Sequence, residues 1–142
     1  MRIQANLVQI YLDDQTEGLV HSIHSLVGSV RADDGVSVIR DHTNDIVILV
    51  GKVLSSTETA ISNTGNTALR DRAEPVMRTL SDCRTRLLNA NTEGESIRDP
   101  ARLKDHNNRL PPMAFEIARE TKELVHRVEQ IYNEAAGDDD FR

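Results

Sequence analysis

The sequence predicts an all-α protein, an up-down-up-down bundle of four helices, and three observations lead to this fold class. Four stretches of the 142-residue chain repeat apolar residues at spacings of three and four, the periodicity of amphipathic helices. Aromatic residues make up only 3% of the chain and tryptophan is absent, so the core must be built from aliphatic side chains. Two short turns and one longer polar segment join the four stretches, as in antiparallel helix bundles.

The first helix is predicted over residues 4–31, and its clearest apolar stripe consists of Leu19, Ile23, Leu26 and Val30. Acidic residues and a glycine weaken the pattern before this stripe, so the helix begins either near Gln4 or near Asp14. We therefore treat residues 1–13 as an N-terminal extension that possibly continues the first helix, and residues 14–136 as the bundle.

The second helix is predicted over residues 36–62, with Ile39, His42, Ile46, Leu49 and Val53 on one face. Its centre, Ile46–Val50, is rich in β-branched residues and is also compatible with a buried strand. We favour a helix, because the stripe continues on both sides and no second strand-like segment exists to pair with it. Residues 63–66 then form a turn.

The third helix has the most regular stripe, composed of Leu69, Ala73, Val76, Leu80, Cys83 and Leu87. Pro75 interrupts it, so either the helix begins near Asp71 with the proline in its first turn, or a longer helix kinks there. We expect the helix to end near Asn91. The polar residues 92–108 are expected to form a long loop, in which Asp99–Pro100 can cap a short helical turn.

The fourth helix is predicted to begin after Leu110, where two prolines are tolerated. Its stripe consists of Met113, Ile117, Thr121, Leu124, Val128 and Ile131. Gly137 is the expected stop, and residues 137–142 form an acidic C-terminal tail.

Composition excludes several classes of protein. Hydrophobic residues (38%) and charged residues (28%) are in the balance of a globular domain, and the net charge of −6 disfavours nucleic acid or anionic membranes as main partners. The single cysteine, Cys83, rules out an intramolecular disulfide and favours a reducing compartment. No leader peptide is evident, and the longest apolar run, Ile46–Val50, is far too short to span a bilayer. We expect a cytoplasmic protein.

Sequence motifs do not predict an enzyme, a cofactor or a metal site. His21 and His24 are three residues apart, but the Glu-x-x-His pairs typical of helical metal sites are absent. Cys83 belongs to a core stripe, which predicts a buried and unreactive thiol. The sequence also contains no nucleophile elbow, phosphate-binding loop or dinucleotide fingerprint.

Positions beside the core stripes of the first and last helices suggest a binding surface. At 100° per residue, one flank of the first stripe contains Val20, His24, Val27 and Arg31, and one flank of the last contains Ala118, Lys122 and Val125. Phe115 lies further towards solvent. Because the first and last helices of a simple bundle are neighbours, these flanks can form a shallow apolar groove with a basic edge. The alternative is that they merely widen the core.

Several segments resemble a known family. Glu74–Val76, Arg84–Ala90 and Glu116–Val125 resemble the C-terminal focal-adhesion-targeting-like domain of GIT scaffold proteins. Ser22–Asp33 is similar to the equivalent domain of fungal polarisome scaffolds of the Spa type. The resemblance covers about residues 14–135 and implies a focal-adhesion-targeting-like four-helix bundle. It also implies a scaffold with a role in cell polarity and the cytoskeleton, concentrated at sites of polarised growth at the cell cortex.

The resemblance implies that short amphipathic acidic helices, the LD motifs, bind between the first and last helices. It adds Arg119 and Lys122 as basic residues of the site. The predicted partner-binding residues are therefore Val20, His24, Val27, Ala118, Arg119, Lys122 and Val125, the apolar ones forming the floor and the basic ones the rim. The alternative function is self-association of the scaffold through its long first helix.

Overall fold

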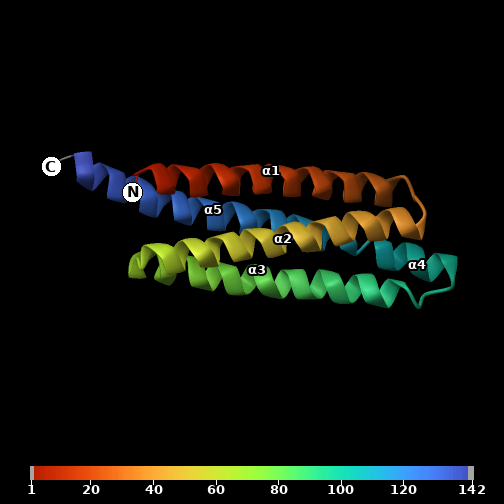
Figure 1. Ribbon diagram of the computed structural model, residues 1–142. Coiled ribbons are helices and arrows are strands. Elements are labelled where there is room, and N and C mark those ends of the chain that lie inside the picture. Colours follow the sequence, from red (N-terminus) through yellow and green to blue (C-terminus); the bar gives the residue numbers. More distant parts are fainter. Residues whose placement is uncertain (1, 141–142) are drawn as a thin grey trace.

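The computed structural model describes residues 2–140 of the chain, and the side chains of residues 12–134. Its helices are α1 (Arg2–Arg31), α2 (Val36–Thr64), α3 (Thr67–Gly94), the short α4 (Pro100–Asn107) and α5 (Leu110–Asp140). Figure 1 shows the four long helices side by side, each antiparallel to the one before it. The predicted fold class, an all-α four-helix bundle, is confirmed.

Each long helix packs against two neighbours. α1 contacts α2 and α5, and α3 also contacts α2 and α5, so the order around the bundle is α1, α2, α3, α5. α4 lies at one end and contacts α3 and α5 (Figure 1). The first and last long helices are therefore adjacent, as expected from the sequence.

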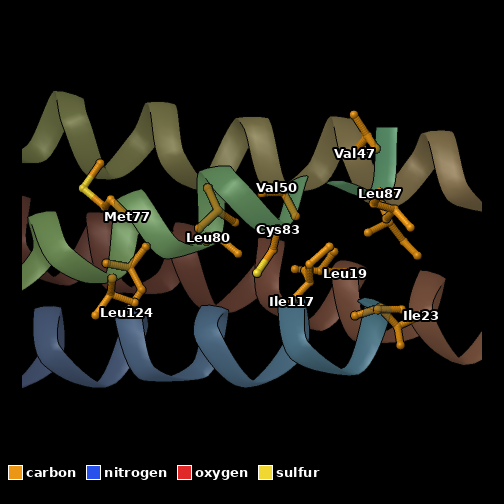
Figure 2. Close-up of a cluster of buried hydrophobic side chains, with 14 of the residues drawn as sticks. Leu19, Ile23, Val47, Val50, Met77, Leu80, Cys83, Leu87, Ile117 and Leu124 are labelled. Carbon is orange, nitrogen blue, oxygen red and sulfur yellow. The ribbon is translucent and has the colours of Figure 1, made fainter. Parts of the chain in front are cut away.

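The core is aliphatic along its whole length. Leu19 of α1, Val50 of α2, Leu80 of α3 and Leu124 of α5 are completely or almost completely buried and lie between the helices in Figure 2. The buried threonine hydroxyl groups are satisfied within their own helices, and Thr121 Oγ1, for example, donates a 2.7 Å hydrogen bond to the carbonyl oxygen of Ile117. Burial of apolar area is thus the main stabilising contribution.

The β-branched run in α2 is helical. Ile46 and Val50 are fully buried, whereas Ile48 between them is exposed. Residues four apart share one face of a helix, and the packing of this face against the core outweighs the β propensity of the segment. The strand alternative is therefore excluded.

The start of α3 resolves the alternatives that Pro75 raised. Gly65 ends α2 in the left-handed conformation (φ 59°), and the Asn66 side chain accepts a hydrogen bond from the Leu69 backbone N–H. α3 therefore begins at Thr67 and runs through Pro75. The start near Asp71 is wrong, because the Asn66 cap and the burial of Leu69 secure the turns before the proline.

The segment between α3 and α5 is more ordered than the expected long loop. α3 continues to Gly94, and α4 begins at Pro100 after Asp99, whose side chain accepts from the Ala101 N–H. His106 of α4 is buried, with Nε2 2.8 Å from the Ala90 carbonyl oxygen. This contact fixes α4 to the end of α3. The short helical turn at Asp99–Pro100 is confirmed, and the prediction of an otherwise irregular loop is wrong.

At the ends of the chain, the structure settles the start of the first helix in favour of the longer alternative and changes the predicted end of the last. α1 is one continuous helix from Arg2, and α5 continues past Gly137 to Asp140, so Gly137 does not stop the last helix. A glycine in a helix costs only about 1 kcal/mol relative to alanine, which a long helix tolerates.

Among the described residues, no helix is long and apolar enough to cross a membrane.

Candidate functional site

Polar contacts between helices show which neighbouring helix one side of α1 and one side of α5 face. Ser56 of α2 donates to Gln15 of α1 (3.4 Å), so that side of α1 faces α2. Arg86 of α3 donates to Glu116 of α5 (3.1 Å), so that side of α5 faces α3. The remaining flanks of α1 and α5 must therefore face each other, since the two helices are in contact.

We call this surface the α1–α5 seam and define it by Val20, His24 and Val27 of α1 and Phe115, Ala118, Lys122 and Val125 of α5. Helical geometry places each of these residues on the flank opposite to the one identified by the polar contacts. The structure thus brings together six of the seven site residues expected from the sequence.

The residues of the seam are buried to different degrees. Val27 and Val125 are only 7% and 8% exposed, Val20 and Ala118 are half-buried, and His24 and Lys122 are exposed. The valines extend the core outwards, and the half-buried residues continue the same apolar surface to solvent. The seam is therefore a shallow apolar strip with a polar edge rather than a deep pocket.

Phe115 is the residue of the seam that the expected site omitted. Its side chain is 50% exposed, and it lies seven residues, about two turns, before Lys122 on the same side of α5. A half-exposed aromatic side chain in a protein with only 3% aromatics is a strong candidate for a binding contact. The seven-residue spacing from Lys122 was the signal in the sequence that pointed to it.

Arg119 does not join the other expected residues. Its side chain is 73% exposed on the solvent-facing side of α5, and its guanidinium is 3.5 Å from the Glu120 carboxylate. The rotation of 100° from Ala118 to Arg119 carries its side chain away from α1. A role for Arg119 in binding stays a prediction, but it is not part of the seam.

A second apolar surface lies on the opposite side of the bundle. Ile48 of α2 is 55% exposed, and Leu88 of α3 is also exposed. Arg84 of α3 bridges these helices, because its Nε donates a 2.9 Å hydrogen bond to the Val47 carbonyl oxygen. Because this α2–α3 surface is apolar and lies away from α1 and α5, substitutions on it are matched controls for those in the seam.

The environment of Cys83 makes it a core residue. Burial raises the pKa of its thiol, and the Glu116 carboxylate raises it further, while Arg86, whose Nη2 is 3.2 Å from the sulfur, acts in the opposite direction. Figure 2 shows Cys83 among Leu80, Val50 and Ile117.

The described residues also contain no cluster of three or more histidine, cysteine or acidic side chains suited to a metal ion.

We expect Cys83 to react slowly with iodoacetamide in the folded protein and rapidly in urea. The thiolate is the reactive form, and a raised pKa keeps it scarce at neutral pH. The rate in the folded protein should still rise with pH beyond the point at which a free cysteine is half ionised. Mass spectrometry of timed samples measures this rate, and equal rates with and without urea would contradict burial of the thiol.

Comparison with known proteins identifies the family. Residues 9–129 match the family model described as "G protein-coupled receptor kinase-interacting protein 1 C term". This chain belongs to that family. The match runs from α1 into α5 and so includes both helices of the seam, and it confirms the resemblance to the GIT C-terminal domain.

A curated relative supports the fungal branch of the resemblance. The chain is 27% identical over 129 residues to "Protein SPA2" of Saccharomyces cerevisiae, an alignment that covers 85% of this chain. The chain spans only 9% of the length of that relative. No solved structure matches the chain significantly. This GIT C-terminal domain is thus related to one segment of a much longer protein.

Proposed function

We propose that this domain is a non-catalytic docking module of a cell-polarity scaffold, and that it binds amphipathic acidic helices of partner proteins at the α1–α5 seam. The observation that carries the proposal is the seam itself, where Phe115 and the half-buried Val20 and Ala118 form an apolar strip bordered by Lys122. Family membership and the similarity to Protein SPA2 support a scaffold role at sites of polarised growth at the cell cortex.

The physical basis of binding would be the burial of apolar side chains. An amphipathic helix presents residues at i, i+3, i+4 and i+7, a spacing that matches the line of Phe115, Ala118, Lys122 and Val125 on α5. Leucines on the partner would cover the apolar strip and supply most of the affinity. Carboxylates beside them would meet Lys122, which mainly affects the rate of encounter and the salt dependence.

The sharpest test of the location compares Lys122→Glu with Arg119→Glu. Both exchange a cation for an anion at exposed positions of α5, but only Lys122 belongs to the seam. Lys122→Glu should weaken binding of an acidic amphipathic peptide about five-fold, because a weak rim attraction becomes a repulsion. Arg119→Glu should change it less than two-fold. Fluorescence anisotropy with a labelled peptide measures both affinities.

Circular dichroism should show that both variants keep the fold, and light scattering should show whether the domain alone is a monomer. If Arg119→Glu weakens binding as strongly as Lys122→Glu, the site is not the seam. A stable dimer that dissociates in Lys122→Glu would instead favour self-association through the first helix.

A further inference from the structure

Directional polar contacts join α2 to α3. The Arg84 Nε donates a 2.9 Å hydrogen bond to the Val47 carbonyl oxygen, and the Asn91 side chain donates a 2.8 Å hydrogen bond to the side-chain oxygen of Asn44. These contacts lie at two different levels of the helix pair. They therefore fix the position of α3 along α2 as well as its rotation.

α3 and α5 are joined in the same way. Arg86 pairs with Glu116 at 3.1 Å, and Arg72 pairs with Glu134 at 3.3 Å. Arg127 of α5 also donates a 2.9 Å hydrogen bond to the Arg72 carbonyl oxygen. Each of these partly exposed contacts is weak by itself, but together they hold three helices in one relative position. We call these helices, with α4 attached to α3, the α2–α3–α5 frame.

α1 has far fewer contacts of this kind. Among residues 12–134, its one hydrogen bond to another helix is from Ser56 Oγ of α2 to Gln15 Oε1, at 3.4 Å, and none of its side chains forms an ion pair with the frame. Gln15 is only 7% exposed, and its Nε2 has no hydrogen-bond partner among the described residues, which destabilises the packing there. α1 is therefore held by non-directional apolar burial, through Leu12, Leu19, Ile23, Leu26 and Val27.

The turn that connects α1 to the frame is also less favourable than the turn between α2 and α3. Gly65 ends α2 in the left-handed conformation, which glycine adopts without strain, and the Asn66 side chain caps α3. In the α1–α2 turn, Asp33 takes the left-handed conformation (φ 55°), and Gly35 precedes α2 without a side-chain cap. A residue with a Cβ is strained in this conformation. Opening the α1–α2 turn therefore relieves strain, whereas opening the α2–α3 turn loses a favourable cap.

We infer that α1 is the least stable unit of the bundle and that it opens by itself while the α2–α3–α5 frame stays folded. Proteins open locally in such cooperative units, and the units with the fewest stabilising contacts open most readily. Val20, His24 and Val27 leave the frame together with α1, so each opening dismantles the seam. This link to docking rests on the proposed function: a partner helix binds only the closed form and stabilises α1 against opening.

The fold thus contains a control of docking. The apparent affinity for a partner is the intrinsic affinity multiplied by the closed fraction. A modification or a second partner that favours the open form would release the docked helix without contacting α5. The frame would need no rearrangement, because the polar contacts that join it do not involve α1.

Hydrogen exchange of the wild-type chain in increasing urea, followed by mass spectrometry, tests the opening directly. Amides of residues 16–31 in α1 should have protection factors about ten-fold lower than those of residues 76–87 in α3. The α1 values should also depend less on urea, because local opening exposes less surface than global unfolding. If both segments show equal protection factors and equal urea dependence, α1 opens only when the whole chain unfolds, and the inference is wrong.

Substitutions at the two turns separate local opening from global unfolding. Gly65→Ala strains a turn that stays folded when α1 opens, so it should lower the protection of α3 about five-fold and leave that of α1 unchanged. A Cβ at this position meets no atom within 4 Å, so the strain comes from the backbone alone. Asp33→Val strains the turn that opens, and this strain is released both in the open form and in the unfolded chain. Both segments should then lose protection by the same factor, about five-fold.

The decisive outcome is the behaviour of α1 in Gly65→Ala. An equal loss of protection in α1 and α3 would overturn the inference, because it would mean that the two segments open together. Circular dichroism should confirm that both variants are folded. If either variant is unfolded, the urea dependence of the wild-type chain decides the question without it.

The link to docking has its own test, with the acidic amphipathic peptide used for Lys122→Glu. At a free peptide concentration ten times the dissociation constant, the protection of α1 should rise about ten-fold, since the open form does not bind. Unchanged protection of α1 while anisotropy shows a bound peptide would mean that the partner binds the frame alone and that α1 does not control docking. If the peptide does not bind at all, the proposed docking function fails, and the exchange in urea still decides whether α1 opens by itself.

Discussion

Replacing Leu80 or Leu124 by alanine should each lower the free energy of unfolding by about 2–5 kcal/mol. Both side chains are 0% exposed, and Figure 2 places them in the centre of the core, on α3 and α5. The cost combines the lost apolar transfer free energy with the cavity that the rigid neighbours leave open. Urea denaturation followed by circular dichroism at 222 nm measures it.

Leu88→Ala is the matched control for this experiment. Leu88 lies on α3, eight residues after Leu80, but it is 40% exposed on the α2–α3 surface. Its replacement should cost less than about 1 kcal/mol. If Leu88→Ala were as destabilising as Leu80→Ala, the side of α3 that faces the core would be assigned wrongly. The seam, which is derived from the same packing, would then have to be reconsidered.

Phe115→Ala should have the largest effect on partner binding, weakening it by roughly 30-fold or about 2 kcal/mol. Phe115 is the large aromatic side chain at the solvent-exposed edge of the seam, and a leucine of the partner can pack against its ring. Half of the side chain is already in solvent, so the folded domain should lose less than about 1 kcal/mol of stability. Isothermal titration calorimetry and urea denaturation of the same variant measure the two effects.

Ile48→Ala tests the opposite surface in the same way. Ile48 is 55% exposed on α2, and its loss should leave binding at the seam unchanged. The reverse result, a large loss with Ile48→Ala and none with Phe115→Ala, would place the partner on the α2–α3 surface. It would leave the fold and the family membership intact.

The sequence by itself determined the fold class and most of the core. Stripes such as Leu69, Leu80 and Leu87 repeat at the helical period, and residues that share one face of a helix are buried together. The sequence also grouped six of the seven seam residues on one flank each of α1 and α5, because the rotation per residue is a property of the helix alone.

Only the tertiary structure decided the features that depend on contacts between distant segments. The His106–Ala90 contact fixes α4 as a helix where composition predicted a loop, and the Asn66 cap with the burial of Leu69 carries α3 past Pro75. Local propensity is worth about 1 kcal/mol per residue, and packing against neighbours outweighs it.

The tertiary structure also decided which residues belong to the seam. The sequence fixes the angle between Arg119 and Lys122 but does not say which of the two flanks of α5 faces α1. The Arg86–Glu116 pair shows that α3 packs on the Glu116 side of α5, which leaves Ala118 and Lys122 on the side of α1. A helix carries its amphipathic pattern in its own sequence, but the identity of the neighbour on each flank is set only when the helices pack, because that choice depends on the burial and pairing of residues far apart in the chain.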